Sequence, residues 1–275
     1  MTTDIVRVFA PAKVNLFLHV GDKRADGFHP LESLAVFVHI GDVLTLERSS
    51  ELSVRIEGPF AEGLSSDGDN LVLKAARALN ANAAITLTKN LPIASGIGGG
   101  SADAAAALRG LNELWSLNRS NLHEVAADLG SDVPVCIRGK AAWMEGRGDI
   151  LTPVSVPALS LVLVNPRVNV STADVFRTLK SRSGLGLRLG LSDDPLRFLM
   201  QTKNDLEAPA RNLQPVIGEV LSAFRRLPDV LLARMSGSGA TCFGIFKDDA
   251  SAAHAAQRLS AANPGWWVRA AKTIQ

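Results

Sequence analysis

The stretch Leu91-Pro92-Ile93-Ala94-Ser95-Gly96-Ile97-Gly98-Gly99-Gly100-Ser101-Ala102-Asp103 is the most informative part of this chain. Four of the five residues from 96 to 100 are glycines, so backbone N–H groups can turn towards a ligand with no Cβ in the way. The alanine-rich segment Ala104–Leu108 follows and favours a helix, with Ser101 as its expected cap. Free N–H groups and the positive dipole end at such a helix start favour a phosphate. The stretch therefore predicts a loop that holds a polyphosphate.

This loop differs from three better-known glycine-rich motifs. A Walker A loop has Lys-Ser or Lys-Thr after its last glycine, where Ser101-Ala102 stands here. The dinucleotide fingerprint needs a glycine three places after Gly98, a position that Ser101 occupies. The protein-kinase loop needs catalytic and metal-binding motifs downstream, and this sequence has neither. A flexible linker is the remaining alternative, and the helix-forming segment behind the loop argues against it.

The composition is that of an ordinary globular enzyme. With 275 residues, of which 47% are hydrophobic and 20% charged, the chain can bury a large core. The net charge is +2, without a run of Lys or Arg, so neither nucleic acid nor a membrane surface is expected as a partner. The two cysteines, Cys136 and Cys242, lie in apolar runs, and no signal-like segment follows Met1. These features predict a cytoplasmic protein.

The spacing of apolar residues predicts an α+β fold with two layers. Strands are expected at 5–9, 14–20, 33–40, 43–47, 52–57, 84–88, 133–137, 141–144, 159–164, 230–235, 241–246 and 266–271. Helices are expected at 69–81, with Asp69 as the cap, and at 101–115, 120–129, 171–179, 195–201, 213–227 and 250–262. A boundary near 153–157 divides the chain into domains 1–155 and 156–275, and the second alternates in a ferredoxin-like manner. Residues 181–194, rich in glycine and charge, are closest to a linker.

Four other segments carry candidate chemistry, and each has an ordinary explanation when it is read alone. Lys13 and Asn15 share one face of a strand, a face that usually meets solvent. Asp132 in Gly130-Ser131-Asp132-Val133-Pro134 can be a turn or cap residue, and His29 beside Phe28 can simply pack. The small residues of Ser236-Gly237-Ser238-Gly239-Ala240 can form a tight hairpin between two strands.

Read together, these segments resemble the GHMP small-molecule kinases. The resemblance rests, in order, on Pro11-Ala12-Lys13-Val14-Asn15-Leu16, Gly27-Phe28-His29, Leu91-Pro92 with Gly96–Ser101, Gly130-Ser131-Asp132-Val133-Pro134 and Ser236-Gly237-Ser238-Gly239-Ala240. It extends over nearly the whole chain, and the first and fourth segments are typical of the member whose substrate is a cytidine-diphosphate alcohol. The resemblance implies an N-terminal half like the second domain of ribosomal protein S5 and a ferredoxin-like C-terminal half.

The resemblance also implies that ATP, with Mg²⁺, phosphorylates an alcohol. Asp132 matches the general base, and Lys13 matches the lysine that keeps this carboxylate ionised. Residues 92–102 match the ATP phosphate loop, and Lys89 matches a lysine near the adenine. Ser101 is a candidate contact for Mg²⁺ or a phosphate oxygen, and no set of protein metal ligands is predicted. A buried carboxylate base also makes physical sense only with a cation beside it.

For the other substrate, His29 matches a residue that bonds the cytosine edge, and Asn15 one near the substrate hydroxyls. Phe28 and Phe176 would stack on the base, since aromatic faces stack on any nucleobase. Thr172 lies four residues before Phe176, on the same helical face, and would reach the same pocket. Phe28 stands where this kind of kinase often has Tyr, and the chain contains no Tyr. Stacking survives that change, whereas a hydroxyl hydrogen bond does not.

Two other functions remain open at this point. One is a sensor of the same fold that binds nucleotide without catalysis, but a sensor does not need both Lys13 and Asp132. The other is a homoserine or mevalonate kinase, although Gly27-Phe28-His29 suits a planar base better than a small acid or amino acid. The residues therefore favour a kinase with a cytidine-containing substrate.

Overall fold

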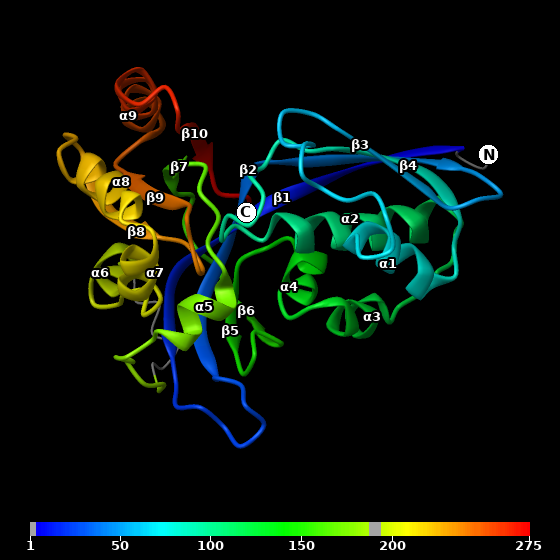
Figure 1. Cartoon of the computed structure of the whole chain (residues 1–275), viewed down its shortest axis with the longest axis horizontal. Coiled ribbons are helices and arrows are strands. Elements are labelled where there is room, and N and C mark those ends of the chain that lie inside the picture. The colour runs from blue at the N-terminus through cyan, green and yellow to red at the C-terminus, as the bar shows by residue number, and fades with distance from the viewer. Residues whose placement is uncertain (1–3, 187–193) are drawn as a thin grey trace. The chain divides into compact units, whose positions relative to one another are not determined.

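The computed structural model describes residues 4–186 and 194–275, which fold into two compact units (Figure 1). Unit 1 contains the described residues of Met1–Lys13, Ile40–Ile93 and Gly98–Gly139. Unit 2 contains those of Val14–His39, Ala94–Ile97 and Lys140–Gln275. Residues 187–193 of the expected linker lie outside the described residues.

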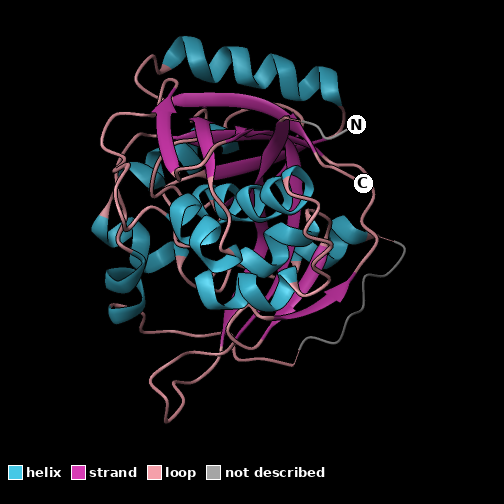
Figure 2. Ribbon diagram, turned by 90° about the vertical axis from the view of Figure 1, so that its right-hand side faces the viewer, coloured by secondary structure: helices cyan, strands magenta, loops and turns pink. Residues whose placement is uncertain are grey.

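Both strands and helices are plentiful, as the α+β prediction requires (Figure 2). The strands are β1 (Ile5–Val20), β2 (Leu31–Arg48), β3 (Ser53–Glu57), β4 (Ala83–Thr88), β5 (Ala142–Glu145), β6 (Ile150–Pro153), β7 (Ser160–Asn165), β8 (Val230–Met235), β9 (Cys242–Phe246) and β10 (Trp267–Lys272). The helices are α1 (Leu71–Leu79), α2 (Gly99–Leu114), α3 (Leu122–Leu129), α4 (Val133–Arg138), α5 (Thr172–Arg177), α6 (Pro195–Met200), α7 (Glu207–Leu213), α8 (Val216–Arg225) and α9 (Asp249–Ala262). No helix among the described residues is long and apolar enough to span a bilayer.

Two long strands replace the four short ones that were predicted at the start of the chain. β1 runs through Pro11, and β2 runs through Gly41 and Asp42, where the sequence predicted breaks. β1 and β2 pair with each other, and pairing with a neighbouring strand outweighs such local signals.

In unit 1, a short sheet is covered by helices α1 to α4 (Figure 1). The second half of β2 pairs antiparallel with β4, with Val43 opposite Thr88, and β4 pairs parallel with β3. The alanines of α2 from 104 to 107 are fully buried, so this helix can pack closely against its neighbours.

Three local predictions in unit 1 are wrong. Asn70, not Asp69, caps α1, because its side chain accepts a hydrogen bond from the Val72 N–H at 2.9 Å. Gly98, not Ser101, is the cap of α2, so Ser101 lies inside the helix. Residues 133–138 form the helix α4 instead of a strand. Their β-branched residues favour a strand, but a proline at the start of a helix costs no hydrogen bond.

Unit 2 contains an antiparallel sheet in the order β10-β7-β9-β8. Helices α5 to α8 follow β7, and α9 lies between β9 and β10 in the chain, so the pattern is the ferredoxin-like one and confirms that prediction. The first half of β2 pairs with β5, with Ser33 opposite Met144, and β5 pairs with β6. The sequence missed β6, a largely exposed edge strand, and α7, which contains a proline.

Candidate active site

Lys13 and Asp132 form an ion pair in unit 1, with Lys13 Nζ 2.8 Å from Asp132 Oδ2. Lys13 lies on β1 and its side chain is only 4% exposed, whereas Asp132, directly before α4, is 38% exposed. The buried ammonium is therefore fixed, and the carboxylate beside it remains open to a ligand. The structure brings together the two residues that the sequence assigned to catalysis.

The glycine loop reaches this pair at Gly98. A Cβ on Gly98 would lie 3.3 Å from Cε of Lys13, and the residue has a φ of +65°, which L side chains rarely adopt. Gly98 also caps α2, and its carbonyl accepts the Ala102 N–H at 2.8 Å. The first N–H groups of α2, at Gly99, Gly100 and Ser101, have no partner within the helix. They can bind an anion next to Lys13, since the first turn holds no acidic residue.

A buried cluster of three charged side chains lies close to the same helix start. Lys89 Nζ is 2.5 Å from Asp42 Oδ2 and 2.6 Å from Asp103 Oδ2. The other oxygen of Asp42 accepts the N–H groups of Asn90 and Leu91, at 2.6 and 2.8 Å. Lys89, which the sequence placed near the adenine, is thus bound to two carboxylates that the sequence did not identify.

Burial changes the proton affinities within this cluster. Desolvation raises the pKa of Asp103 to about 7, the Lys89 ammonium opposes the rise, and the Asp42 charge adds to it. Burial alone would lower the pKa of Lys89, but the charges of Asp103 and Asp42 outweigh it and raise that pKa. Lys89 therefore remains a cation, and burial brings the pKa of Asp103 into the neutral range.

In unit 2, the turn after β8 packs closely on residues 94–97 of the loop. Ser236 Oγ accepts the N–H of Asn15 and donates to the carbonyl of Gly96, both at 3.0 Å. A Cβ on Gly96, whose φ is +73°, would overlap the Ser236 carbonyl. The small residues of this turn are thus needed for contact with the loop, not only for a hairpin.

Asn204 holds this turn in place, and no sequence pattern points to it. Its side-chain amide donates to the carbonyls of Met235 and Gly237, both at 2.8 Å, and its oxygen accepts the Leu206 N–H at 2.9 Å. A lone asparagine in a loop has many possible roles, so only the fold reveals that it fixes the Ser-Gly turn.

Asn15 keeps a free acceptor in the interior of unit 2. Its Nδ2 donates to Ser33 Oγ at 2.7 Å, and the Ser33 hydroxyl in turn donates to the Phe17 carbonyl. This chain of bonds fixes which end of the amide is oxygen. Among the described residues, Asn15 Oδ1 is buried without a hydrogen-bond partner. A ligand hydroxyl could satisfy it.

The residues expected to hold a cytidine group also lie in unit 2. His29 and Phe176 stack, with ring centroids 5.8 Å apart and planes 22° from parallel, and His29 Nδ1 bonds the Gly21 carbonyl at 3.0 Å. Phe28 is 47% exposed, and the Arg147 guanidinium lies 3.7 Å above its ring. The structure thus brings His29 to Phe176, and gives Phe28 a cationic neighbour that the sequence did not suggest.

Thr172 lies at the start of α5 and contacts the Ser-Gly turn. Its Oγ1 is 2.8 Å from Oγ of Ser238. Phe176, one helical turn further along α5, faces His29. The helix α5 therefore connects the expected base pocket with the turn that packs on the loop.

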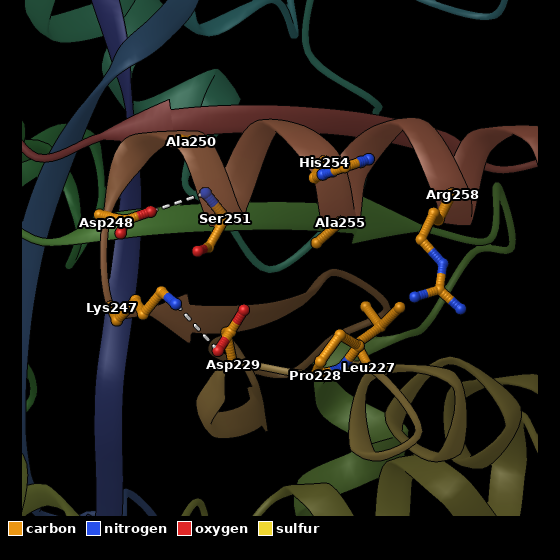
Figure 3. Close-up of a pocket in the computed structure, with 10 residues that line it drawn as sticks. All are labelled: Leu227, Pro228, Asp229, Lys247, Asp248, Ala250, Ser251, His254, Ala255 and Arg258. Carbon is orange, nitrogen blue, oxygen red and sulfur yellow. Dashed lines mark hydrogen bonds and ion pairs between the residues drawn. The ribbon is translucent and has the colours of Figure 1, made fainter.

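A separate pocket of about 400 Å³ lies beside α9 in unit 2 (Figure 3). It is lined by Leu227, Pro228, Asp229, Lys247, Asp248, Ala250, Ser251, His254, Ala255 and Arg258. Its charged residues are partly paired, with Lys247 Nζ 3.1 Å from Asp229 Oδ1. None of the residues that the sequence assigned to ATP or to the second substrate lines this pocket.

The part of the chain that the structure describes contains no group of three or more His, Cys, Asp or Glu side chains that could hold a metal ion. Mg²⁺ commonly uses only one or two protein ligands and otherwise water and substrate phosphates.

Two family models match this chain. The model described as GHMP kinases N terminal domain matches residues 70–140, and the one described as GHMP kinases C terminal matches residues 188–265. The first match includes the glycine loop and Asp132, and the second includes Asn204 and the Ser-Gly turn.

The chain is also similar to proteins named 4-diphosphocytidyl-2-C-methyl-D-erythritol kinase. The one from Cereibacter sphaeroides (strain ATCC 17025 / ATH 2.4.3) is 49% identical over 278 residues, with 98% of this chain and 99% of that protein covered. The one from Rhodopseudomonas palustris (strain BisB18) is 50% identical over 285 residues, with coverage of 95% and 92%. A crystal structure of 4-(cytidine 5'-diphospho)-2C-methyl-D-erythritol kinase aligns with a TM-score of 0.81 at 30% identity, covering 98% of this chain and all of that one.

Proposed function

The chain belongs to the GHMP kinases, and we propose that Lys13, Asp132 and the start of α2 form the centre at which it phosphorylates an alcohol. The reaction is the transfer of a phosphoryl group from ATP to the 2-hydroxyl of 4-diphosphocytidyl-2-C-methyl-D-erythritol, in the non-mevalonate route to isoprenoid precursors. The observation that carries the site is the position of the Lys13–Asp132 pair directly beside Gly98 of the phosphate loop.

The proton of the alcohol moves to Asp132. The alcohol oxygen attacks the γ-phosphorus, the bond from that phosphorus to the β–γ bridging oxygen breaks, and ADP leaves with the electron pair. Lys13 holds the carboxylate of Asp132 at 2.8 Å and stabilises negative charge on the attacking oxygen. Because no covalent intermediate on the protein is needed, the chain contributes position and charge stabilisation.

The phosphates of ATP bind at the N-terminus of α2. The N–H groups of Gly99, Gly100 and Ser101 are free to donate there, and the helix dipole adds attraction for an anion. Mg²⁺ would be held by the ATP phosphates with the Ser101 hydroxyl as the protein contact. When bound, it neutralises charge that develops on the phosphoryl oxygens.

The second substrate is held by unit 2. His29 and Phe176 offer a ring edge and a ring face for cytosine, with Phe28 as a second stacking surface and Thr172 at the side of the pocket. The free Oδ1 of Asn15 suits a substrate hydroxyl. Asn15 follows Lys13 by two residues on β1, so both side chains project from the same face of the strand.

A coupled assay of ADP formation tests this function. The enzyme is given ATP with the cytidine-diphosphate methylerythritol, with homoserine or with mevalonate, and we expect turnover with the first alone. Turnover with homoserine or mevalonate instead would assign another member of the family. Nucleotide binding without turnover on any alcohol would favour the non-catalytic sensor. A cytoplasmic location remains a prediction of the sequence.

A further inference from the structure

Asp42, Lys89 and Asp103 form a charged cluster that connects the two ends of the phosphate loop. Asp42 lies on β2, Lys89 directly follows β4, and Asp103 lies in the second turn of α2. Their side chains are 0%, 3% and 5% exposed, respectively. The cluster therefore lies within the interior of unit 1.

One end of the loop is fixed by Asp42. Its Oδ1 accepts the backbone N–H groups of Asn90 and Leu91, the two residues before Pro92. Its Oδ2 bonds the ammonium of Lys89 at 2.5 Å. The carboxylate thereby orders both the backbone that enters the loop and the lysine beside it.

The other end of the loop is fixed by Asp103, the residue after Ala102. Its Oδ2 bonds the same Lys89 ammonium at 2.6 Å, so Lys89 links α2 to the segment that enters the loop. A Cβ added to Gly99 would lie 3.1 Å from Lys89 Nζ and 3.8 Å from Asp42 Oδ2. No side chain therefore separates the cluster from the first residue of α2, where the phosphates are expected.

Stability alone is a poor explanation for this cluster. Buried ion pairs are often no more stabilising than apolar residues of the same size, because desolvation offsets their attraction. Here two carboxylates share one ammonium, and Asp103 Oδ1 is buried without a hydrogen-bond partner among the described residues. Two buried carboxylates with a single ammonium between them are unfavourable for stability. The cluster therefore suggests a role in positioning the phosphate loop.

We propose that Asp42 and Asp103 are positioning residues for ATP, which act through Lys89 to hold both ends of the phosphate loop. They set the direction of the free N–H groups at Gly99 to Ser101, and they hold the ammonium next to the bound nucleotide. This inference rests on the proposed function, in which the loop binds the ATP phosphates.

The test compares Asp103→Ala with Asp103→Asn. Alanine removes the contact to Lys89, so we expect the Kd of ATP to rise about tenfold and its KM to follow, with the KM of the cytidine substrate within about twofold of wild type. Asparagine keeps an oxygen that can accept from Lys89, and should restore most of the ATP affinity. Asp42→Asn keeps the two backbone N–H contacts but loses the hydrogen bond from Lys89. Its ATP affinity should therefore be closer to that of Asp103→Ala than to that of Asp103→Asn.

Asp205→Asn is the matched control in unit 2. Asp205 is also a buried carboxylate that accepts backbone N–H groups, from Val20 and Ser183, both at 2.8 Å. Its loss should lower the melting temperature but leave the Kd of ATP unchanged. Calorimetry of ATP binding to the full chain, without an alcohol present, gives the affinity of each variant.

Three results would overturn the inference. One is a folded Asp103→Ala protein that binds ATP as wild type does. A second is equal loss of affinity for ATP and for the cytidine substrate, and a third is no recovery with asparagine. If Asp103→Ala does not fold, the variants Asp103→Asn and Asp42→Asn still test the proposal. Unchanged ATP affinity in both of them would contradict it. A wild-type protein that binds ATP but phosphorylates no alcohol would contradict the proposed function alone.

Discussion

The Lys13 ammonium lies 2.8 Å from the Asp132 carboxylate, and the two partners differ greatly in burial. Lys13 is 4% exposed and packs against Gly98 of the loop, whereas Asp132 is 38% exposed. A fixed cation beside an accessible carboxylate suits a base that must meet a substrate hydroxyl. It does not suit a pair that serves only stability, because an ion pair open to water contributes about 0–1 kcal/mol.

Replacing Asp132 by Asn keeps the size and polarity of the side chain but removes the proton acceptor. We expect turnover to fall roughly a hundredfold or more, with the affinity for ATP almost unchanged. Steady-state kinetics and calorimetry measure the two quantities. Asp128→Asn, at an exposed position of α3, is the control and should behave as wild type. Near-normal turnover of Asp132→Asn would remove Asp132 from the reaction.

The Lys13→Ala variant tests whether the pair acts as one unit. Loss of the ammonium removes charge support from the step in which Asp132 takes the proton. The losses in turnover of Lys13→Ala and Asp132→Asn should therefore not add in the double variant, which should be about as slow as the worse single variant. Additive losses would mean that the two residues contribute separately.

The sequence predicted the fold class, which the comparisons confirm, and the ferredoxin-like second half, which the strand order β10-β7-β9-β8 confirms. Local spacing was sufficient there, because the central strands β7 and β9 are short apolar runs that are almost entirely buried. The strand predicted at residues 133–137 is wrong, since β-branched residues favour a strand and only the position of Pro134 indicates a helix start.

The sequence found the members of the site that lie in recognisable motifs, such as Lys13, Asp132 and the glycine loop. It could not find Asp42 or Asn204. These residues act through contacts with partners 47 and 31 residues away, at Lys89 and Met235, and no local pattern predicts such a contact. The roles of the individual site residues remain predictions.

Gly99→Val tests the loop directly. Gly99 is the first residue of α2, and the positive φ values in the loop are at Ala94, Gly96 and Gly98. We expect an effect at Gly99 because of its neighbour: a Cβ there would lie 3.1 Å from Lys89 Nζ. ATP affinity should drop steeply while the melting temperature falls little. Gly265→Val, with open space around it, is the control, and unaltered ATP binding of Gly99→Val would make the loop structural only.

The free energy of unfolding should depend on pH through Asp103. Burial raises its pKa to about 7 in the folded chain, against an ordinary value of 3.8. Between about pH 4 and 7, the folded state therefore holds a proton that the unfolded state has released. The resulting contribution of Asp103 to the free energy of unfolding is complete below about pH 4 and is lost as the pH rises through 7. Asp42 and Lys89 are the charged groups that face it. Urea unfolding from pH 5 to 8 should show a decline that is smaller in Asp103→Asn, and an unchanged profile would contradict the raised pKa.

The last prediction concerns the pocket for the cytidine group. If Phe176 stacks on cytosine, the contact is worth on the order of 1–3 kcal/mol, so Phe176→Ala should raise the KM of the cytidine substrate about tenfold or more. The KM of ATP should hardly change. His29 stacks on Phe176 in this structure, so removal of the ring also frees the imidazole and adds to the loss. Phe28→Tyr should be tolerated, because the ring and its contact with Arg147 remain.

His29→Ala separates hydrogen bonding from stacking in the same pocket. It should weaken binding of the cytidine substrate and relax discrimination against uridine analogues, because the imidazole is the group expected to read the edge of the base. Kinetic constants for both substrates in Phe176→Ala, Phe28→Tyr and His29→Ala decide the assignment. If Phe176→Ala and His29→Ala alter the constants for ATP instead, or alter neither substrate, the base is bound elsewhere. The stacked rings of His29 and Phe176 would then serve only the packing of α5.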